Sequence, residues 1–320
     1  MGGRLLGVSA ALAVLAANAC GQAFPTKPVR LVVPYAPGGS SDIIARLYGQ
    51  RLSETLGQTF VVDNRPGAGG TIGTNILAKS PADGYTLILQ DMPHTINPAV
   101  YGKLPYDPVK DFTPLTLVAR APQWLFVHPA VPARTVRELI ALAKAQPGEL
   151  KIGSASNGSG THLMAELFMR GGGVELTHVP YKGAGPAVTA TVGGETNAVF
   201  TSMPAAVTFV QAGRLRPVGV TTAKRHPSHP EVPTFEESGV PNMVLHHWFG
   251  VLAPAGLPKP IQEKLTREFT AAVSHPTIVE RYQALILEPA TLTPEEFRKL
   301  IETDLARWGK VVREAGIKVQ

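Results

Sequence analysis

The sequence predicts an α/β protein made of two α/β units that face each other across a cleft. Two observations predict it. Short apolar strands alternate with amphipathic helices along the chain, as in parallel sheets covered by helices. A strand, a turn of small residues and a helix N-terminus also recur in both halves. Because open α/β sheets bind ligands at the carboxyl ends of their strands, these turns predict a binding site between the units.

The first unit begins with residues 29–57, which read as strand, turn and helix. The apolar run VRLVV predicts a buried strand, and Gly38-Gly39 then allows a tight turn without side chains. Ser40 or Ser41 is expected to cap the helix, and Asp42 suits the positive end of its dipole. The helix is expected to have one apolar face, which consists of Ile44, Tyr48, Leu52 and Leu56. Gly57 is expected to end the helix. The helix start predicts an anion site, although such a turn also occurs in βα connections that bind nothing.

Further strands are expected at residues 59–63 and 85–89, with a helix at 71–79 between them. This β-α-β-α-β order predicts a parallel sheet with right-handed crossovers. The glycines of residues 64–73 resemble a dinucleotide fingerprint, but their spacing is one residue too long, which favours a turn that feeds the helix. Residues 91–113 contain four prolines and are expected to form loops.

The second unit repeats the opening pattern. Thr135 is expected to cap a helix at 136–146, and a strand at 151–153 leads through small and hydroxyl residues to a helix at 162–170. The pattern recurs over residues 176–192, where Pro186 suits the first helical position. Further strands are expected at 198–200, 216–220 and 248–253, and long amphipathic helical regions at 260–287 and 294–315.

Composition excludes several classes of function. The formal net charge is +6, but the basic residues are scattered and are not interleaved with aromatic residues, which argues against nucleic-acid binding. No metal-ligand spacing is present; His246 and His247 are adjacent and would point in different directions on a strand. No cofactor is expected.

The N-terminus has the pattern of a secretory signal. A charged start, an apolar stretch at residues 5–17 and small residues up to Ala23 predict a signal peptide over residues 1–23. Cleavage there would remove Cys20, the only cysteine, and leave an exported protein. The alternative is that Cys20 is a lipid-anchored first residue, a pattern that the preceding Ala17 fits poorly.

Several residues have both a structural and a functional interpretation. Ser156 or Ser159 with His162 would suit a small exported hydrolase, but no orienting carboxylate is evident, and helix capping with ligand hydrogen bonding is the preferred interpretation. Lys182 would neutralise a carboxylate or be solvated. Trp248 would wall the cleft or fill the core.

A series of motifs resembles the substrate-binding proteins of tripartite tricarboxylate transporters, the Bug family. They are PYAPGGSSDIIAR (34–46), NRPGAGGTIG (64–73), ADGYTL (82–87), KLPYDPVKDF (103–112), GSASNGSGTHL (153–163), HVPYKG (178–183), VPTFEESG (232–239) and WFGVLAPAG (248–256). Together they follow the family order over nearly the whole exported chain. The resemblance implies a periplasmic-binding-protein-like fold of the Venus-flytrap type II, with residues 24–121 and 248–320 in domain 1 and 122–247 in domain 2.

The resemblance also implies the function and the site. It implies a periplasmic protein, expected to be a monomer, that captures a small organic carboxylate and delivers it to a membrane permease. A sensor partner in place of the permease, or a neutral or aromatic solute, remains an alternative. The residues expected to bind the ligand are Tyr35, Pro37, Gly38, Gly39, Ser40, Ser41, Asp42, Ser154, Ser156, Asn157, Gly158, Thr161, His162, Tyr181, Lys182, Ser202 and Trp248.

This sequence departs from the family pattern in two places. Glu195-Thr196-Asn197 stands where many members have an aspartate after a Gly-Gly turn, and His246-His247 stands where a small or hydroxyl residue is usual. The histidines leave the identity of the ligand open.

Overall fold

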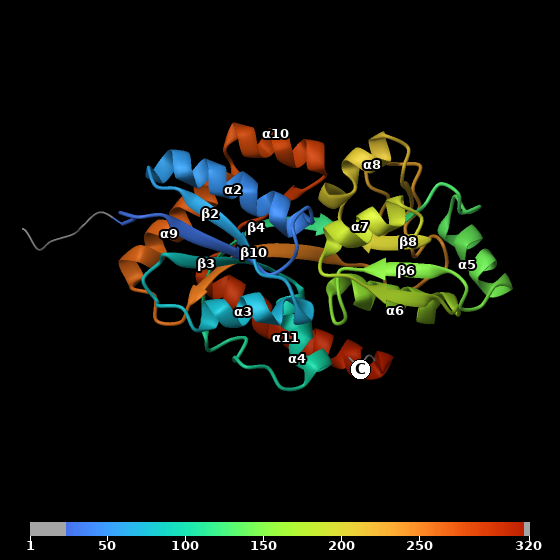
Figure 1. The fold of residues 1–320 in the computed structure, drawn as a ribbon, viewed down its shortest axis with the longest axis horizontal. Helices are drawn as coiled ribbons and strands as arrows, with labels where there is room; N and C mark the ends of the chain where they lie inside the picture. The colour runs from blue at the N-terminus through green and yellow to red at the C-terminus, as the bar shows by residue number, and fades with distance from the viewer. Residues whose placement is uncertain (1–23, 317–320) are drawn as a thin grey trace, which may run out of the picture.

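The computed structural model describes residues 24–316, which form two mixed β-sheets with helices on both faces of each sheet (Figure 1). This confirms the predicted pair of α/β units. The expected signal peptide lies outside the described residues. Within residues 24–316, no helix combines the length and the apolar character needed to cross a bilayer.

The first sheet has the strand order β11-β4-β10-β3-β1-β2. Strands β1, β2 and β3 are parallel, as the β-α-β-α-β pattern predicts, and Leu31 lies between Val62 and Leu87. Strand β10 lies between β3 and β4 and is antiparallel to both. The strands are β1 (Val29–Val33), β2 (Phe60–Asn64), β3 (Thr86–Asp91), β4 (Phe112–Pro122), β10 (His246–Pro254) and β11 (Glu288–Pro289).

Two helical layers cover this sheet. One layer, with α2, α9 and α10, packs on the face that carries Leu31 and Leu89. The other layer, with α3, α4 and α11, packs on the face that carries Val32 and Ile88, as the alternation of side chains along a strand requires. The helices are α2 (Ser40–Leu56), α3 (Thr71–Ala78), α4 (Pro93–Tyr101), α9 (Lys259–Val273), α10 (Pro276–Leu285) and α11 (Pro294–Ala315), with the short 3-10 turn η2 (Ala68–Gly70) before α3.

The second sheet has the order β7-β6-β8-β5-β9. Strand β6 is parallel to β7 and β8, whereas β5 is antiparallel to β8 and β9. Helix α6 packs on the face that carries Leu125, and α7 packs on the opposite face with Trp124. The elements are β5 (Trp124–Val127), α5 (Val136–Ala145), β6 (Lys151–Ser154), α6 (Gly160–Gly172), β7 (Thr177–Pro180), α7 (Ala184–Val192), β8 (Ala198–Thr201), η3 (Met203–Ala205), α8 (Val207–Gln211) and β9 (Arg216–Val220).

The chain crosses between the sheets twice, and one threonine ties the crossings together. Gln123 joins β4 to β5, and residues 221–245 lead from β9 to β10. The Thr221 N–H donates to the Gln123 carbonyl (3.0 Å), and the Gln123 N–H donates to Thr221 Oγ1 (2.9 Å). Thr221 Oγ1 also donates to the Leu245 carbonyl (2.8 Å), so both segments are held at one point.

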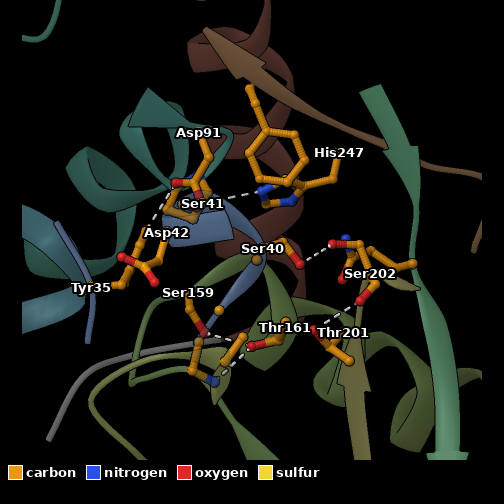
Figure 2. Close-up of a pocket in the computed structure, with 17 residues that line it drawn as sticks. Tyr35, Ser40, Ser41, Asp42, Asp91, Ser159, Thr161, Thr201, Ser202 and His247 are labelled. Atoms are coloured by element: carbon orange, nitrogen blue, oxygen red, sulfur yellow. Dashed lines mark hydrogen bonds and ion pairs between the residues drawn. The ribbon is translucent and has the colours of Figure 1, made fainter. Parts of the chain in front are cut away.

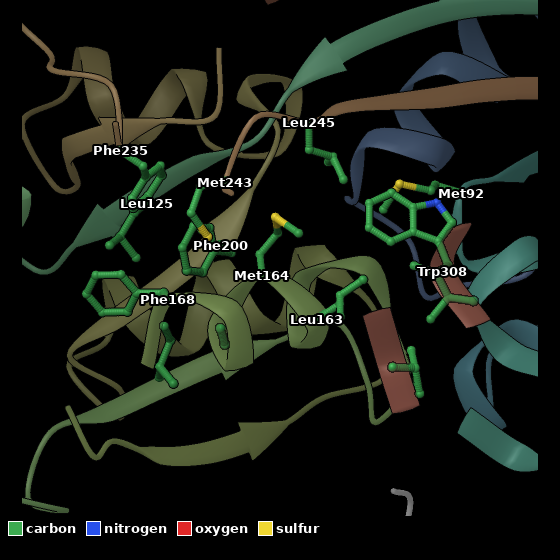
Figure 3. Packing of buried hydrophobic residues seen from close by; sticks show 14 of the residues in the cluster. Met92, Leu125, Leu163, Met164, Phe168, Phe200, Phe235, Met243, Leu245 and Trp308 are labelled. Atoms are coloured by element: carbon green, nitrogen blue, oxygen red, sulfur yellow. The ribbon is translucent and has the colours of Figure 1, made fainter. Parts of the chain in front are cut away.

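One apolar cluster runs from one unit into the other beneath the sheets. Phe168, Phe200 and Phe235 form its aromatic part in the second unit, and Trp308 of α11 belongs to the same cluster (Figure 3). Their rings are buried, and burial of this kind is the main source of stability of the fold. Helix α11 therefore packs beneath both units.

Four details differ from the sequence-based predictions. Residues 93–101 form α4, where a loop was expected, because Pro93 occupies the helix start and tolerates the helical backbone there. The region 260–287 contains two helices, since Pro276 begins α10 after the turn at Ser274. Pro186 is the third residue of α7, which begins at Ala184, rather than the first. Helix α2 is capped by Gly39, and not by Ser40 or Ser41.

Candidate functional site

A small cavity, with a volume of ≈ 40 Å³, lies between the two sheets (Figure 2). Side chains and backbone of both units line it, which fits the cleft expected at the carboxyl ends of the strands. The lining residues are Tyr35, Gly39, Ser40, Ser41, Asp42, Asp91, Pro93, Gln123, Ala155, Ser159, Gly160, Thr161, Ala184, Thr201, Ser202, His247 and Phe249.

Three helices begin at this cavity. Ser40 of α2, Gly160 of α6 and Ala184 of α7 are each the first helical residue, and all three line it. The first N–H groups of a helix have no partner within the helix, and its N-terminus has a partial positive charge. The cavity therefore receives N–H donors from both units.

The start of α2 is held by Asp42 rather than by a serine cap. The Gly38 N–H donates to Asp42 Oδ2 (3.0 Å), and Asn64 Nδ2 donates to Oδ1 (3.0 Å). Burial alone would raise the pKa of Asp42, but hydrogen bonds from Arg46, Gly38 and Asn64 lower it. Because the carboxylate fixes the turn, the hydroxyls of Ser40 and Ser41 are left for other partners.

The start of α6 is held by its own hydroxyl groups. Ser159 Oγ accepts from the His162 N–H (3.2 Å) and donates to the Ser156 carbonyl (2.8 Å). Thr161 Oγ1 accepts from the Ala155 N–H (2.9 Å). These bonds shape the turn so that its backbone faces the cavity.

A buried carboxylate, Asp91, lies on the cavity wall at the end of β3. Tyr35 Oη donates to Asp91 Oδ1 (2.9 Å), Ser41 Oγ donates to Oδ2 (3.1 Å), and His247 Nε2 lies 3.3 Å from Oδ2 (Figure 2). Burial, together with Asp91, raises the pKa of Tyr35 well above its usual range. Sequence reasoning missed Asp91 by placing it in a loop, although the carboxyl end of the third parallel strand was the signal for it.

The two units touch on both sides of the cavity. Ser202 Oγ donates to Ser40 Oγ (2.8 Å), and the Ala36 N–H donates to the Lys182 carbonyl (2.9 Å). On another side, Tyr101 Oη donates to the Asn157 carbonyl (2.7 Å). The structure is therefore a closed arrangement of the cleft.

The predicted ligand-binding residues fall into two groups. Seven line the cavity: Tyr35, Gly39, Ser40, Ser41, Asp42, Thr161 and Ser202. The others do not: Pro37, Gly38, Ser154, Ser156, Asn157, Gly158, His162, Tyr181, Lys182 and Trp248. Of these, Pro37, Gly38 and Tyr181 line a second hollow beside α7.

Strand alternation separates the residues around Trp248. His247 and Phe249 face the cavity, whereas His246 and Trp248 face the other side of β10. Trp248 Nε1 donates to Asp304 Oδ2 (2.9 Å), and its ring packs on Phe297. The adjacent histidines thus point in different directions, as their spacing predicts.

The geometry does not favour a serine nucleophile activated by His162. His162 Nδ1 accepts from the Gly158 N–H (3.1 Å), and Nε2 lies 3.4 Å from Glu166 Oε1. Neither ring nitrogen is bonded to Ser156 or Ser159 within the described residues. Both nitrogens hold local structure, and the candidate hydrolase site is not assembled.

A polar cavity closed between two α/β units, with donors from both, defines a two-domain solute-binding protein. Known proteins agree with this class. The family described as "Tripartite tricarboxylate transporter family receptor" matches residues 44–317. Protein BugT of Bordetella pertussis (strain Tohama I) is 37% identical over 318 residues, which are 99% of this chain and 98% of BugT.

Two solved structures with bound ligands are also similar. The structure of R. palustris Rpa4515 with adipate has a TM-score of 0.89 at 40% identity, and the match covers 93% of this chain and all of that one (100%). The structure of MatC (Rpa3494) from Rhodopseudomonas palustris with bound malate has a TM-score of 0.84 at 32% identity, over 90% of this chain and 100% of that one.

The chain belongs to the tripartite tricarboxylate transporter receptor family, as a Bug-type substrate-binding protein. It is a periplasmic solute-binding protein with a two-domain type II fold, and it is not an enzyme. The resemblance found in the sequence is confirmed, and the hydrolase alternative is wrong.

Proposed function

We propose that this protein captures a small organic carboxylate and delivers it to a membrane permease of the tripartite tricarboxylate type. The observation on which this proposal rests is the meeting of three helix N-termini, of α2, α6 and α7, at one cavity. Such N-termini bind anions through free N–H groups and the helix dipole. The adipate and malate in two similar structures support the same ligand chemistry.

The proposed mechanism is domain closure. We propose that the domains are residues 24–121 with 248–320 and residues 122–247, hinged where Thr221 joins the two crossings. A ligand that contacts N–H groups of both units has a higher affinity for the closed state and shifts the population toward it. We also propose that the exported protein lacks residues 1–23 and acts as a monomer.

A thermal-shift screen tests the carboxylate proposal. The purified exported protein is first unfolded and refolded to remove carried ligand, and is then mixed with mono-, di- and tricarboxylates, amino acids and nicotinamide compounds. A ligand at a hundred times its Kd adds about 2.7 kcal/mol to the free energy of unfolding. At roughly 2–4 °C per kcal/mol, Tm rises by several degrees.

A matched pair of variants places the binding in the cavity. Gly39→Leu adds a side chain at the start of α2, where a Cβ would lie 3.4 Å from the Gly185 nitrogen, and we expect it to abolish the shift. Gln50→Leu adds the same side chain on the exposed part of the same helix and should leave the shift intact. A Tm that no carboxylate changes would contradict the proposal and favour a neutral ligand.

Delivery to a permease is tested separately. The ligand-loaded protein should bind to vesicles that contain a tripartite tricarboxylate permease encoded in the same genome and should promote uptake of the ligand. Capture of a sensor kinase instead would favour the signalling alternative.

A further inference from the structure

The wall of the cavity formed by β3 and β10 carries hydrogen-bond acceptors rather than donors. Asp91 is only 5% exposed, and its carboxylate accepts from Tyr35 and Ser41. The hydroxyl protons of Tyr35 and Ser41 are therefore already used. A carboxylate has about four lone-pair sites, so Asp91 can still accept from a ligand.

His247 adds a second acceptor to this wall. Its Nε2 lies 3.3 Å from Asp91 Oδ2, whereas Nδ1 is buried without a partner among the described residues. A Cβ on Gly160, the first residue of α6, would lie 3.4 Å from Nδ1. When the ring proton is on Nε2, Nδ1 can accept a hydrogen bond from a ligand.

Gln123, at the crossing between the units, supplies a third acceptor, its Oε1, on an amide that also carries the donor Nε2. Its side chain is 2% exposed and lines the cavity, and its Oε1 is buried without a partner within residues 24–316. Buried polar atoms are almost always satisfied in native proteins. Among the described residues that line the cavity, the buried side-chain atoms without a hydrogen-bond partner are Gln123 Oε1 and His247 Nδ1. A ligand with donor groups would satisfy both.

Donors and acceptors are therefore separated in the cavity. Backbone N–H donors lie at the starts of α2, α6 and α7, and acceptor atoms lie on Asp91, His247 and Gln123, whose amide also carries a donor. In the view of Figure 2, Asp91 and His247 lie on one side and Ser159 and Thr161 on the other. A ligand that fits this arrangement has an anionic end and a donor end.

We propose that the ligand is a small zwitterion, with its carboxylate at the helix N-termini and its ammonium group at Asp91 and His247. This inference rests on the proposed carboxylate function and narrows it. Asp91 is then the residue that sets specificity, because it attracts the ammonium group and repels a second carboxylate. Two carboxylates in a cavity from which water is largely excluded interact unfavourably, and such repulsion against the wrong ligand is an effective source of specificity.

A series of four-carbon acids isolates the charge at the far end of the ligand. The affinities of the refolded wild-type protein for succinate, butyrate, 2-aminobutyrate and 4-aminobutyrate are measured by titration calorimetry, with adipate and 6-aminohexanoate as a longer pair. We expect at least one amino acid to bind ten-fold or more tightly than the dicarboxylate of the same length, with the unsubstituted acid between them.

The variant Asp91→Asn removes the charge and keeps the shape. We expect it to weaken binding of the amino acid ten-fold or more, to strengthen binding of the dicarboxylate, and so to reverse their order. Glu54→Gln removes one negative charge from the exposed part of α2, and should leave the order unchanged. The wild-type ranking tests the inference even if Asp91→Asn does not fold.

The possible failures are distinguishable. A dicarboxylate that binds the wild-type protein as tightly as its amino acid counterpart would overturn the zwitterion inference and leave the carboxylate function intact. If Asp91→Asn weakened the binding of all the acids by the same factor, Asp91 would have a structural role only. This result would also overturn the zwitterion inference. Absence of binding by every acid in the series and in the wider screen would overturn the proposed function itself.

Discussion

Ser202 Oγ donates a hydrogen bond to Ser40 Oγ over 2.8 Å and so joins η3 of one unit to α2 of the other. Both serines line the cavity and both are buried. Because its partners belong to different sheets, separation of the two units would break the bond. It therefore stabilises the closed state selectively.

Removal of either hydroxyl should weaken ligand binding. A hydrogen bond of this kind contributes about 1 kcal/mol, so we expect Ser202→Ala and Ser40→Ala each to raise Kd roughly five-fold. In the double variant the second substitution should add little, because the bond is already lost. Calorimetry measures all four proteins. Ser228→Ala, at an exposed serine, is the control; fully additive losses would show that each serine acts on the ligand separately.

Gly185 limits how closely the units approach. A Cβ on this residue would lie 2.6 Å from the Pro37 carbonyl oxygen and 2.9 Å from the Gly38 carbonyl carbon, both in the other unit. We expect Gly185→Ala to prevent full closure and to raise Kd ten-fold or more, with little change in Tm of the ligand-free protein. Small-angle scattering should then show no decrease in radius of gyration on addition of ligand.

Gly193→Ala is the matched control, because it changes the residue that ends α7, where the backbone has ordinary helical angles and space for a Cβ. Normal compaction of Gly185→Ala by ligand would mean that the contact does not limit closure.

Stability should fall as the pH is lowered from 6.5 toward 4. Burial lowers the pKa of His94 to about 4, although the Pro108 carbonyl and Asp91 oppose the shift. Below pH 6.5 the unfolded chain therefore binds a proton that the folded protein does not, and the folded state loses up to about 1.4 kcal/mol per pH unit. Burial also lowers the pKa of His178 to about 4. His178 therefore contributes to the same loss of stability at low pH.

Urea unfolding at pH 6.5, 5.5 and 4.5 measures this slope. We expect His94→Gln to reduce it by about 1 kcal/mol per pH unit, whatever its effect on stability at pH 7. Carboxylates with lowered pKa, such as Asp42, contribute to the loss only below about pH 5. An unchanged slope in the variant would show that His94 does not drive the loss.

Trp248 should matter for stability rather than for binding. Trp248→Phe removes the hydrogen bond to Asp304, whose pKa is raised chiefly by burial, and leaves a buried acceptor without its donor. We expect a loss of about 1–3 kcal/mol with Kd changed less than two-fold. Trp124→Phe is the control, because the buried Trp124 Nε1 has no partner within the described residues. A large rise in Kd for Trp248→Phe would place the ring in the ligand site.

Local patterns in the sequence were sufficient to predict most of the fold. The apolar runs and the C-terminal Gly57 predicted β1 and α2, and the stripe that begins at Phe297 predicted α11 with its bounds. The prediction missed α4 because prolines were interpreted only as residues that end helices, whereas Pro93 begins this helix. Pro276 was a readable signal for the start of α10.

The site could be predicted only in part, because half of its wall depends on pairing between distant segments. The glycine and serine turns were readable as helix starts. Asp91 and His247 meet because β10 pairs antiparallel with β3, which places Phe249 opposite Asp91 and brings His247 to the same face. The pairing register between β3 and β10 cannot be deduced from the local sequence of either strand. Gln123 likewise can be recognised as a cavity residue only when its position between the two sheets is known.

The central position of β10 in the first sheet has a consequence for folding. The strands of the second sheet come from one continuous stretch, residues 124–220, so that unit can fold as soon as it has been synthesised. The first sheet cannot form in this way, because the edges of β3 and β4 that face each other stay unpaired until residues 246–254 have been synthesised and pair between them. Completing it requires closure of a loop that contains all the strands of the second sheet, which makes the contact order high and the step slow. We therefore expect the unit that contains the second sheet to be native while the N-terminal strands still expose edges that are prone to aggregation, so that a chaperone would act on the part of the chain made first.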